Sequence, residues 1–210
     1  MKALLATFGF SLGGAAAAAL LGHAPQRAHV APRQAPHRLS VPAGRIAITP
    51  EALRQAYAAG LVDRPITTVL DVQTPMTYGD YRWDDEGVPA GPTWVRVDLR
   101  SQLISVFRSG QEIGTAVVLY GADGVPTPTG KFPILAKLKD HRSATYDGAP
   151  MPYTLRLTPD GVSIHGSNVR WGFATHGCVG VPTAFAARLF DAVKTGDEVL
   201  IVAPAKNWAS

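Results

Sequence analysis

The sequence from Trp94 to Phe107, WVRVDLRSQLISVF, alternates hydrophobic with polar side chains. Val95, Val97 and Leu99 alternate with charged residues, and a second hydrophobic run follows a short polar break. A period of two is typical of a β-strand with one buried face, so these two runs predict a β-hairpin.

Further short hydrophobic runs follow this hairpin and are separated by Gly and Pro. They occupy residues 114–120, 131–136, 153–157, 162–165 and 198–202. We expect one helix at residues 183–195, ended by Gly196, and a shorter one at residues 49–59, ended by Gly60. Many short strands with frequent turns predict a mainly β fold, a sandwich or barrel with one or two short helices.

The N-terminal 24 residues have the layout of a secretory signal peptide, with Lys2, an Ala-rich apolar run and small residues up to Ala24. If it stays uncleaved, this segment would instead be a membrane anchor. Residues 25–48 are rich in Arg and Pro, which predicts an extended linker. We expect an N-terminal extension at residues 49–91, a main domain at residues 92–204, and export to the periplasm or cell envelope.

The net charge of +4 is located mainly outside the expected domain. Five of the 20 basic residues precede residue 46, which leaves 15 basic against 16 acidic side chains in the remainder. A nearly neutral domain argues against a nucleic-acid partner. We expect a monomer that contacts a membrane only through an uncleaved signal.

The sole cysteine of the chain, Cys178, lies 13 positions after His165. A thiol becomes a nucleophile when an imidazole beside it accepts its proton, so this pair is a candidate for covalent acyl transfer. Gly177 permits a tight turn at which the backbone amides of Gly177 and Cys178 converge on a developing oxyanion.

Two other interpretations of these residues stay open. His165, His176 and Cys178 provide three of the donors that a zinc site uses, although no carboxylate or second cysteine is placed to complete the set. The histidines are also compatible with an ordinary place in the core or in a loop.

The sequence around Cys178 resembles the active-site signature of the L,D-transpeptidase catalytic domain (YkuD type), in which His-Gly precedes Ser/Thr-His-Gly-Cys. Three further segments agree: the hairpin with Gln102, the run from Thr127 to Phe132 (TPTGKF), and Met151-Pro152-Tyr153. The resemblance covers residues 92–204 and implies the mainly β fold of that family.

The resemblance also implies roles for individual residues. Cys178 corresponds to the nucleophile, His165 to the general base, and Gly166 to the residue whose carbonyl orients His165. The oxyanion turn would comprise Thr175, His176 and Gly177. Trp171, Tyr153 and Tyr146 are weaker candidates for substrate contacts. One position departs from the family, since Gly180 stands where an Arg or Asn is usual.

An L,D-transpeptidase forms a thioester with a tetrapeptide stem of peptidoglycan, releases D-alanine and transfers the stem to an amine, which gives a 3-3 cross-link. The resemblance implies this activity without a metal or organic cofactor, and acylation by carbapenems. An L,D-carboxypeptidase and a lipoprotein-anchoring transferase would share the thioester and differ in the acceptor. A non-catalytic peptidoglycan-binding domain is the alternative that Gly180 favours.

Overall fold

The computed structural model describes residues 43–122, 124–145 and 147–202. The expected signal segment 1–24 and most of the linker 25–48 lie outside the described residues. The elements are β1 (Arg45–Ala47), α1 (Pro50–Ala58), β2 (Thr68–Leu70), β3 (Tyr81–Trp83), β4 (Thr93–Asp98), β5 (Leu103–Arg108), β6 (Gln111–Val117), β7 (Gly130–Pro133), β8 (Ala136–Arg142), β9 (Pro150–Arg156), β10 (Ser163–Ser167), β11 (Val179–Pro182), α2 (Thr183–Ala192) and β12 (Glu198–Val202).

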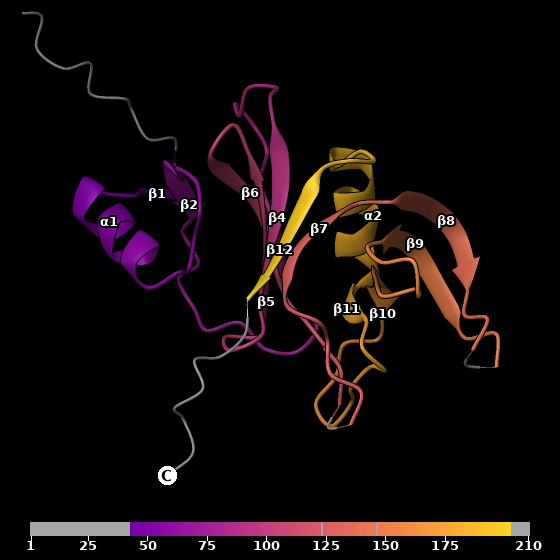
Figure 1. Cartoon of the computed structure of the whole chain (residues 1–210). Coiled ribbons are helices and arrows are strands. Elements are labelled where there is room, and N and C mark those ends of the chain that lie inside the picture. The colour runs from indigo at the N-terminus through magenta and orange to yellow at the C-terminus, as the bar shows by residue number, and fades with distance from the viewer. Residues whose placement is uncertain (1–42, 123, 146, 203–210) are drawn as a thin grey trace, which may run out of the picture. The chain divides into compact units, whose positions relative to one another are not determined.

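The larger sheet has the strand order β1-β2-β6-β5-β4-β12-β7, and β3 pairs with β6 beside this path. Antiparallel pairing of β4 with β5 places Val95 opposite Val106 and Val97 opposite Ile104, and all four side chains are fully buried. This confirms the predicted hairpin. The strand β12 lies between β4, with which it pairs in parallel, and the edge strand β7, with which it pairs antiparallel (Figure 1).

The smaller sheet has the order β11-β10-β9-β8, and its strands β10 and β11 are parallel. Helix α2 contacts β9, β10, β11 and β6, so it packs against both sheets. Its buried residues Phe185 and Leu189 belong to the same core cluster as Ile113 of the larger sheet and Ile164 of the smaller one. The prediction of a mainly β fold with two short helices is confirmed for the described residues.

The strand predicted at residues 131–136 is interrupted in the structure, and the chain changes sheets at this point. β7 ends at Pro133, and β8 begins at Ala136 in the other sheet. The amide of Ile134 still donates to Asp197 beside β12, whereas the amide of Leu135 donates to Arg156 of β9. The change of sheet therefore falls between Ile134 and Leu135, whose amides donate to different sheets.

Helix α2 is shorter than the prediction of residues 183–195. It ends at Ala192, and Val193 is extended and buried in the core. A β-branched side chain with a place in the core favours extended backbone over another helical turn. Gly196, expected as the helix stop, belongs instead to the turn before β12, where its φ is +91° and its amide donates to Ile134.

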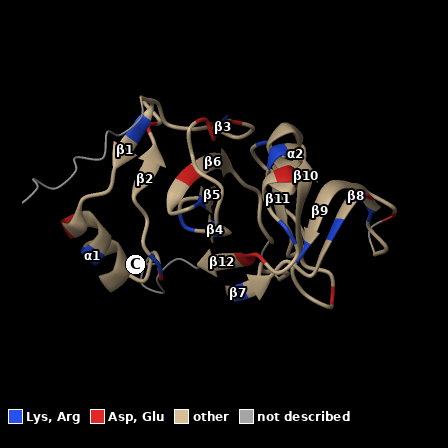
Figure 2. Cartoon of the chain, turned by 90° about the horizontal axis from the view of Figure 1, so that it is seen from above, with Lys and Arg blue, Asp and Glu red and all other residues tan. Residues whose placement is uncertain are grey.

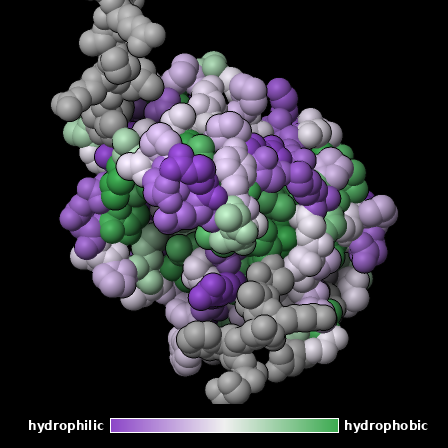
Figure 3. Space-filling model, turned by 60° about the vertical axis from the view of Figure 1, so that its left-hand side comes forward, coloured by the Kyte–Doolittle hydropathy of each residue, from purple (hydrophilic) through white to green (hydrophobic). Residues whose placement is uncertain are grey.

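A second hydrophobic cluster joins the segment around α1 to the larger sheet. Trp94 and Phe107 stack with ring centroids 4.5 Å apart, and Val62 and Ile66 pack with them. The Arg64 guanidinium lies 4.7 Å from the centre of the Trp94 ring. Ile46, Tyr57 and Leu61 of this segment are exposed hydrophobic residues. The space-filling view shows hydrophobic patches interspersed with hydrophilic surface (Figure 3).

Charged residues are spread over the described chain and are not gathered on one face (Figure 2). Arg45, Asp98 and Glu112 are buried, and the fully buried Arg45 side chain donates to the backbone carbonyls of Glu112 and Asp84. No helix among the described residues is long and apolar enough to cross a membrane. The strands β2 and β3 of the expected extension pair with β6 of the expected domain, so the two parts share one sheet. The boundary between residues 91 and 92 stays a prediction.

Candidate active site

The parallel pairing of β10 with β11 brings the two halves of the sequence motif onto neighbouring strands. Ile164 lies opposite Val179, and His165 lies opposite Gly180. Ile164 and Val179 are both buried in the main core. Because side chains alternate along a strand, His165 projects from the face opposite to Ile164. Cys178 lies in the turn that immediately precedes β11.

The Cys178 thiol is half-buried and lies against the start of β10. Its Sγ is 3.9 Å from the carbonyl oxygen of Gly161. Burial raises the pKa of the Cys178 thiol above its ordinary value; a hydrogen bond from the Ser163 backbone opposes this effect, and the negative charge of Asp160 adds to it. The thiol is therefore protonated at neutral pH.

The His165 ring is held by the main chain of the next residue. Its Nδ1 lies 3.0 Å from the carbonyl oxygen of Gly166. A carbonyl only accepts, so Nδ1 carries the hydrogen and Nε2 keeps its lone pair. Burial lowers the pKa of His165, the Gly166 contact opposes this effect, and the charge of His141 on β8 lowers the pKa further. Near pH 7 the ring is a neutral base.

The turn that leads to Cys178 depends on Gly177. Its φ is +96°, a left-handed conformation that glycine adopts at little cost. Within the same turn, the Thr175 hydroxyl donates to the carbonyl of Cys178, and His176 is exposed. The turn therefore has a fixed backbone before β11 begins.

Thr127, which is distant in sequence, also contacts the backbone of Cys178. The hydroxyl of Thr127 lies 3.4 Å from the carbonyl oxygen of Cys178 and accepts a 2.9 Å hydrogen bond from the amide of Gly121. The sequence analysis used Thr127 only as part of a resemblance and did not predict this contact. The contact joins residues 51 positions apart, and nothing in the local pattern signals it.

The loop between the two motif halves exposes two aromatic side chains. Trp171 is 81% exposed and meets Tyr78 edge-on, with ring centroids 5.6 Å apart. Phe173 is 55% exposed, and the Arg170 guanidinium lies 4.7 Å from its ring centre. Trp171 is thus accessible to a ligand from the loop that precedes Thr175.

The other two aromatic candidates are placed differently. Tyr153 packs against Phe190 of α2, with ring centroids 5.8 Å apart. Its φ of +57° is unusual for a tyrosine, and it lies where β9 diverges from β10, since their pairing includes Leu155 and Arg156 only. Tyr146 lies outside the described residues.

The zinc alternative requires that His165, His176 and Cys178 converge on one point. Within residues 43–122, 124–145 and 147–202, no three His, Cys, Asp or Glu side chains are grouped as a metal ion would require. The described residues thus have His165 on β10 and Cys178 in the turn before β11, without grouping them with His176 as metal ligands.

Comparison with known proteins agrees with this arrangement. The family model of the L,D-transpeptidase catalytic domain (YkuD) matches residues 92–201, which is just over half of the chain. The chain belongs to this family. Members of the L,D-transpeptidase family act on peptidoglycan stem peptides and are normally cysteine enzymes.

Individual relatives are distant. L,D-transpeptidase 1 of Mycobacterium tuberculosis is 29% identical over 136 residues, which cover 56% of this chain and 53% of the relative, so the chain spans about half the length of that protein. The structure of an Ldtfm-avibactam carbamoyl enzyme is 26% identical with a TM-score of 0.50, over 54% of this chain and 49% of that one. An L,D-transpeptidase from Stackebrandtia nassauensis shares the fold, with 24% identity and a TM-score of 0.51 over 56% and 58% of the two chains.

Gly180, where this chain departs from the L,D-transpeptidase family, is enclosed by its neighbours. A Cβ added at Gly180 would lie 3.1 Å from Cβ of Ser167 and 3.4 Å from Cβ of Leu119. Its φ is not in the left-handed region, so Gly180 is not a turn residue as Gly177 is. Gly180 is a strand residue whose missing side chain leaves room for Ser167 and Leu119.

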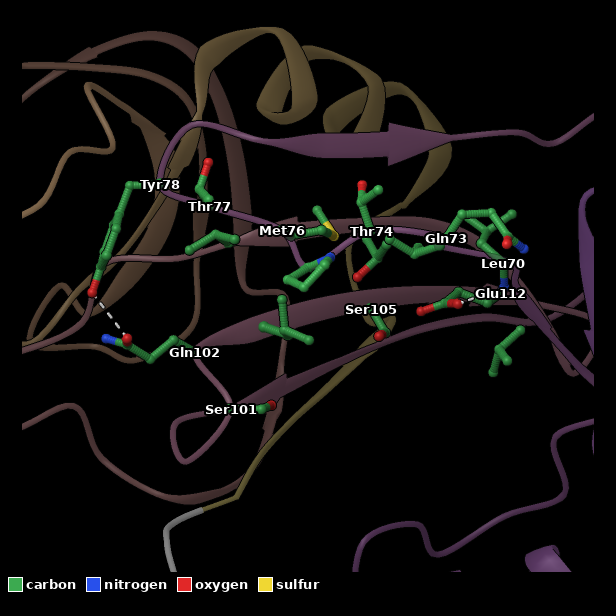
Figure 4. A pocket seen from close by; sticks show the side chains of 16 residues that line it. Leu70, Gln73, Thr74, Met76, Thr77, Tyr78, Ser101, Gln102, Ser105 and Glu112 are labelled. Atoms are coloured by element: carbon green, nitrogen blue, oxygen red, sulfur yellow. Dashed lines mark hydrogen bonds between the residues drawn. The ribbon is translucent and has the colours of Figure 1, made fainter.

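A cavity away from His165 and Cys178 opens on the larger sheet. It measures about 790 Å³ and is bounded by residues 69–78 and by side chains of β5 and β6 (Figure 4). Its polar groups are paired: the Tyr78 hydroxyl donates to Gln102 at 2.9 Å, and the Glu112 carboxylate accepts from the amide of Leu70 at 2.8 Å. Neither His165 nor Cys178 lines this cavity. The buried Glu112 carboxylate hydrogen-bonds β6 to Leu70 of β2, which gives it a structural role.

Proposed function

We propose that the protein is a peptidoglycan L,D-transpeptidase in which Cys178 is the nucleophile and His165 the base. The observation that carries the proposal is the parallel pairing of β10 with β11, which begins one residue after Cys178 and sets His165 opposite Gly180. The Gly166 carbonyl supports it, because it leaves Nε2 of His165 as the nitrogen that can accept a proton.

In the first half-reaction, the Cys178 sulfur attacks the carbonyl carbon of the third residue of a tetrapeptide stem. The thiol proton passes to Nε2 of His165, a C–S bond forms, and the oxyanion lies near the amides of Gly177 and Cys178. The C–N bond to the terminal D-alanine then breaks. His165 returns the proton to the leaving amine, which leaves a thioester and a neutral imidazole.

In the second half-reaction, the amine of another stem attacks the thioester carbonyl. His165 accepts a proton from this amine, the C–S bond breaks, and the sulfur recovers the proton from His165. The product is a 3-3 cross-link and the free enzyme. Every step uses groups of the chain and the two stems.

The environment of the pair explains why the proton moves during the attack. Burial raises the pKa of Cys178 and lowers that of His165, so the uncharged thiol and imidazole are the stable pair in the free protein. The thiolate then forms only when an electrophile is in place. This protects a single exported thiol from oxidation, since oxidation requires the thiolate.

Water or a lipoprotein lysine as acceptor would turn the same thioester toward hydrolysis or protein anchoring. A non-catalytic wall-binding domain is the second candidate, because the Arg or Asn expected at position 180 is replaced by Gly180. We favour the enzyme because Ser167 and Leu119 fill the space beside Gly180, and the cysteine and histidine are both retained. We also propose that residues 1–24 direct export to the periplasm.

The test is incubation of the purified protein with disaccharide tetrapeptides, followed by mass spectrometry of the products. The proposal expects free D-alanine and cross-linked dimers, and neither from Cys178→Ala. Release of D-alanine without dimers would assign the carboxypeptidase activity. No D-alanine, combined with retention of the protein on insoluble peptidoglycan, would support the wall-binding domain.

A further inference from the structure

The main-chain carbonyl of Cys178 is contacted by two threonine hydroxyls. Thr175 reaches it from within the same turn, and Thr127 reaches it from a loop 51 positions earlier. A carbonyl oxygen has two lone pairs and can accept both hydrogen bonds. Because the two donors come from different chain segments, together they restrict rotation of the peptide that follows Cys178.

The Thr127 hydroxyl is itself fixed. Thr127 is 5% exposed, and its Oγ1 accepts from the amide of Gly121 at 2.9 Å. The loop between these residues is so tight that a Cβ on Gly121 would lie 2.1 Å from the Val125 carbonyl oxygen. With its lone pair used by Gly121, the hydroxyl hydrogen of Thr127 is free to point at Cys178.

The residues just before Gly121 and Thr127 also form backbone hydrogen bonds with the turn that contains Cys178. The amide of Thr175 donates to Tyr120 at 2.9 Å, and the amide of Ala122 donates to Thr175 at 3.0 Å. Leu119 and Gly180 exchange two backbone hydrogen bonds, of 2.8 and 2.9 Å. Residues 119–122 thus hydrogen-bond to the chain on both sides of Cys178, and Thr127 is the side chain after this segment that reaches the Cys178 carbonyl.

We infer that Thr127 is a positioning residue for Cys178, through the hydrogen bond from its hydroxyl to the Cys178 carbonyl. The inference rests on the proposed function. Holding this carbonyl restricts ψ of Cys178 and so fixes the place of its Cα, from which both the thiol side chain and the N–H expected to donate to the oxyanion extend. Small displacements of such groups reduce rates strongly, so Thr127 acts on the acylation rate more than on ligand binding.

The experiment measures single-turnover acylation of Cys178 by a carbapenem over a range of concentrations. In Thr127→Val the volume is kept and the hydroxyl is lost, and we expect the limiting rate to fall about tenfold with a little-changed half-saturating concentration. Thr127→Ser keeps the hydroxyl and should recover most of the rate. Thr115→Val removes another buried hydroxyl, 5% exposed on β6, and should acylate like the wild type.

Wild-type rates in a folded Thr127→Val protein would overturn the inference, as would an equal loss in Thr115→Val. If the valine variant does not fold, Thr127→Ala removes the same hydroxyl and is judged in the same way. A wild-type protein that forms no adduct would instead refute the proposed function. In that case amide hydrogen exchange tests whether the Thr127 hydroxyl holds this loop. The Gly121 amide, which donates to Thr127, must exchange faster in Thr127→Val than in Thr115→Val, and equal exchange would refute the positioning role of Thr127.

Discussion

His165 lies directly opposite Gly180 in the parallel pairing of β10 with β11. In the L,D-transpeptidase family this neighbour of the histidine usually carries an Arg or Asn side chain. Here Ser167, two residues after His165 on the same strand face, approaches the position that a Cβ of residue 180 would take. The cross-strand surroundings of the histidine thus depend on Ser167 in this chain.

The fit between Gly180 and Ser167 predicts a coupled pair of substitutions. Gly180→Asn introduces a Cβ 3.1 Å from that of Ser167, and we expect a loss of about 1–3 kcal/mol in the free energy of unfolding. Ser167→Gly removes the obstructing side chain. Urea denaturation of both single variants and the double variant should show that the second substitution relieves the first. Strict additivity of the two effects would contradict this packing.

The raised pKa of Cys178 predicts how its reactivity depends on pH. Because burial disfavours the thiolate, the rate of alkylation by iodoacetamide should still be rising where an ordinary thiol has reached its plateau. The measurement is the alkylation rate of the protein and of free cysteine at about ten pH values between pH 6 and pH 10, the range in which thiols titrate. A plateau reached in mildly acidic solution would instead indicate a thiolate paired with a histidinium.

The lowered pKa of His165 predicts a contribution to the pH dependence of stability. Between the ordinary pKa of histidine and the lower pKa in the folded protein, the unfolded chain binds more protons. The free energy of unfolding must therefore decrease as the pH falls through this window. In His165→Asn the decrease should be smaller, as measured by urea denaturation at several pH values. Parallel curves for the two proteins would show that His165 is not buried as a neutral base.

Phe185 predicts where the fold is most sensitive. This α2 residue is fully buried and meets Trp83 and Tyr81 of β3 edge-on, with centroids 5.5 and 6.1 Å apart. We expect Phe185→Ala to lower the free energy of unfolding by about 3–5 kcal/mol. Phe173→Ala, at a side chain that is 55% exposed, is the control and should change it by less than about 0.5 kcal/mol. Similar losses in both would contradict the assignment of the core.

The parts of the fold that could be predicted have local signals. The β4–β5 hairpin has a clear period of two, and α1 has a Thr49 side chain that accepts from the amide of Ala52 at 3.1 Å, as an N-cap does. The strands β1, β2 and β3 were missed because three residues are too few to show a period. The change of sheet after Pro133 depends on partners distant in sequence, so no local pattern marks it.

The candidate site likewise contains residues with a local sequence signal and contacts that no local signal marks. His165, Gly177 and Cys178 stand out because their residue types and spacing suit a nucleophile, a base and a turn. The pairing of β10 with β11, the contact of Thr127 with Cys178, and the enclosure of Gly180 all join segments that only the folded chain brings together. The sequence therefore predicts the reacting groups, and the structure is needed for the residues that hold them.

The most direct measurement is the intact mass of the purified protein after exposure to a carbapenem. If Cys178 is the nucleophile, the wild-type protein gains the mass of one inhibitor molecule, and Cys178→Ala gains none. Thr115→Val, which alters a buried residue of β6 that does not line the turn around Cys178, must gain the same mass as the wild type. An unmodified wild-type protein, or an adduct that persists in Cys178→Ala, would contradict the assignment of Cys178.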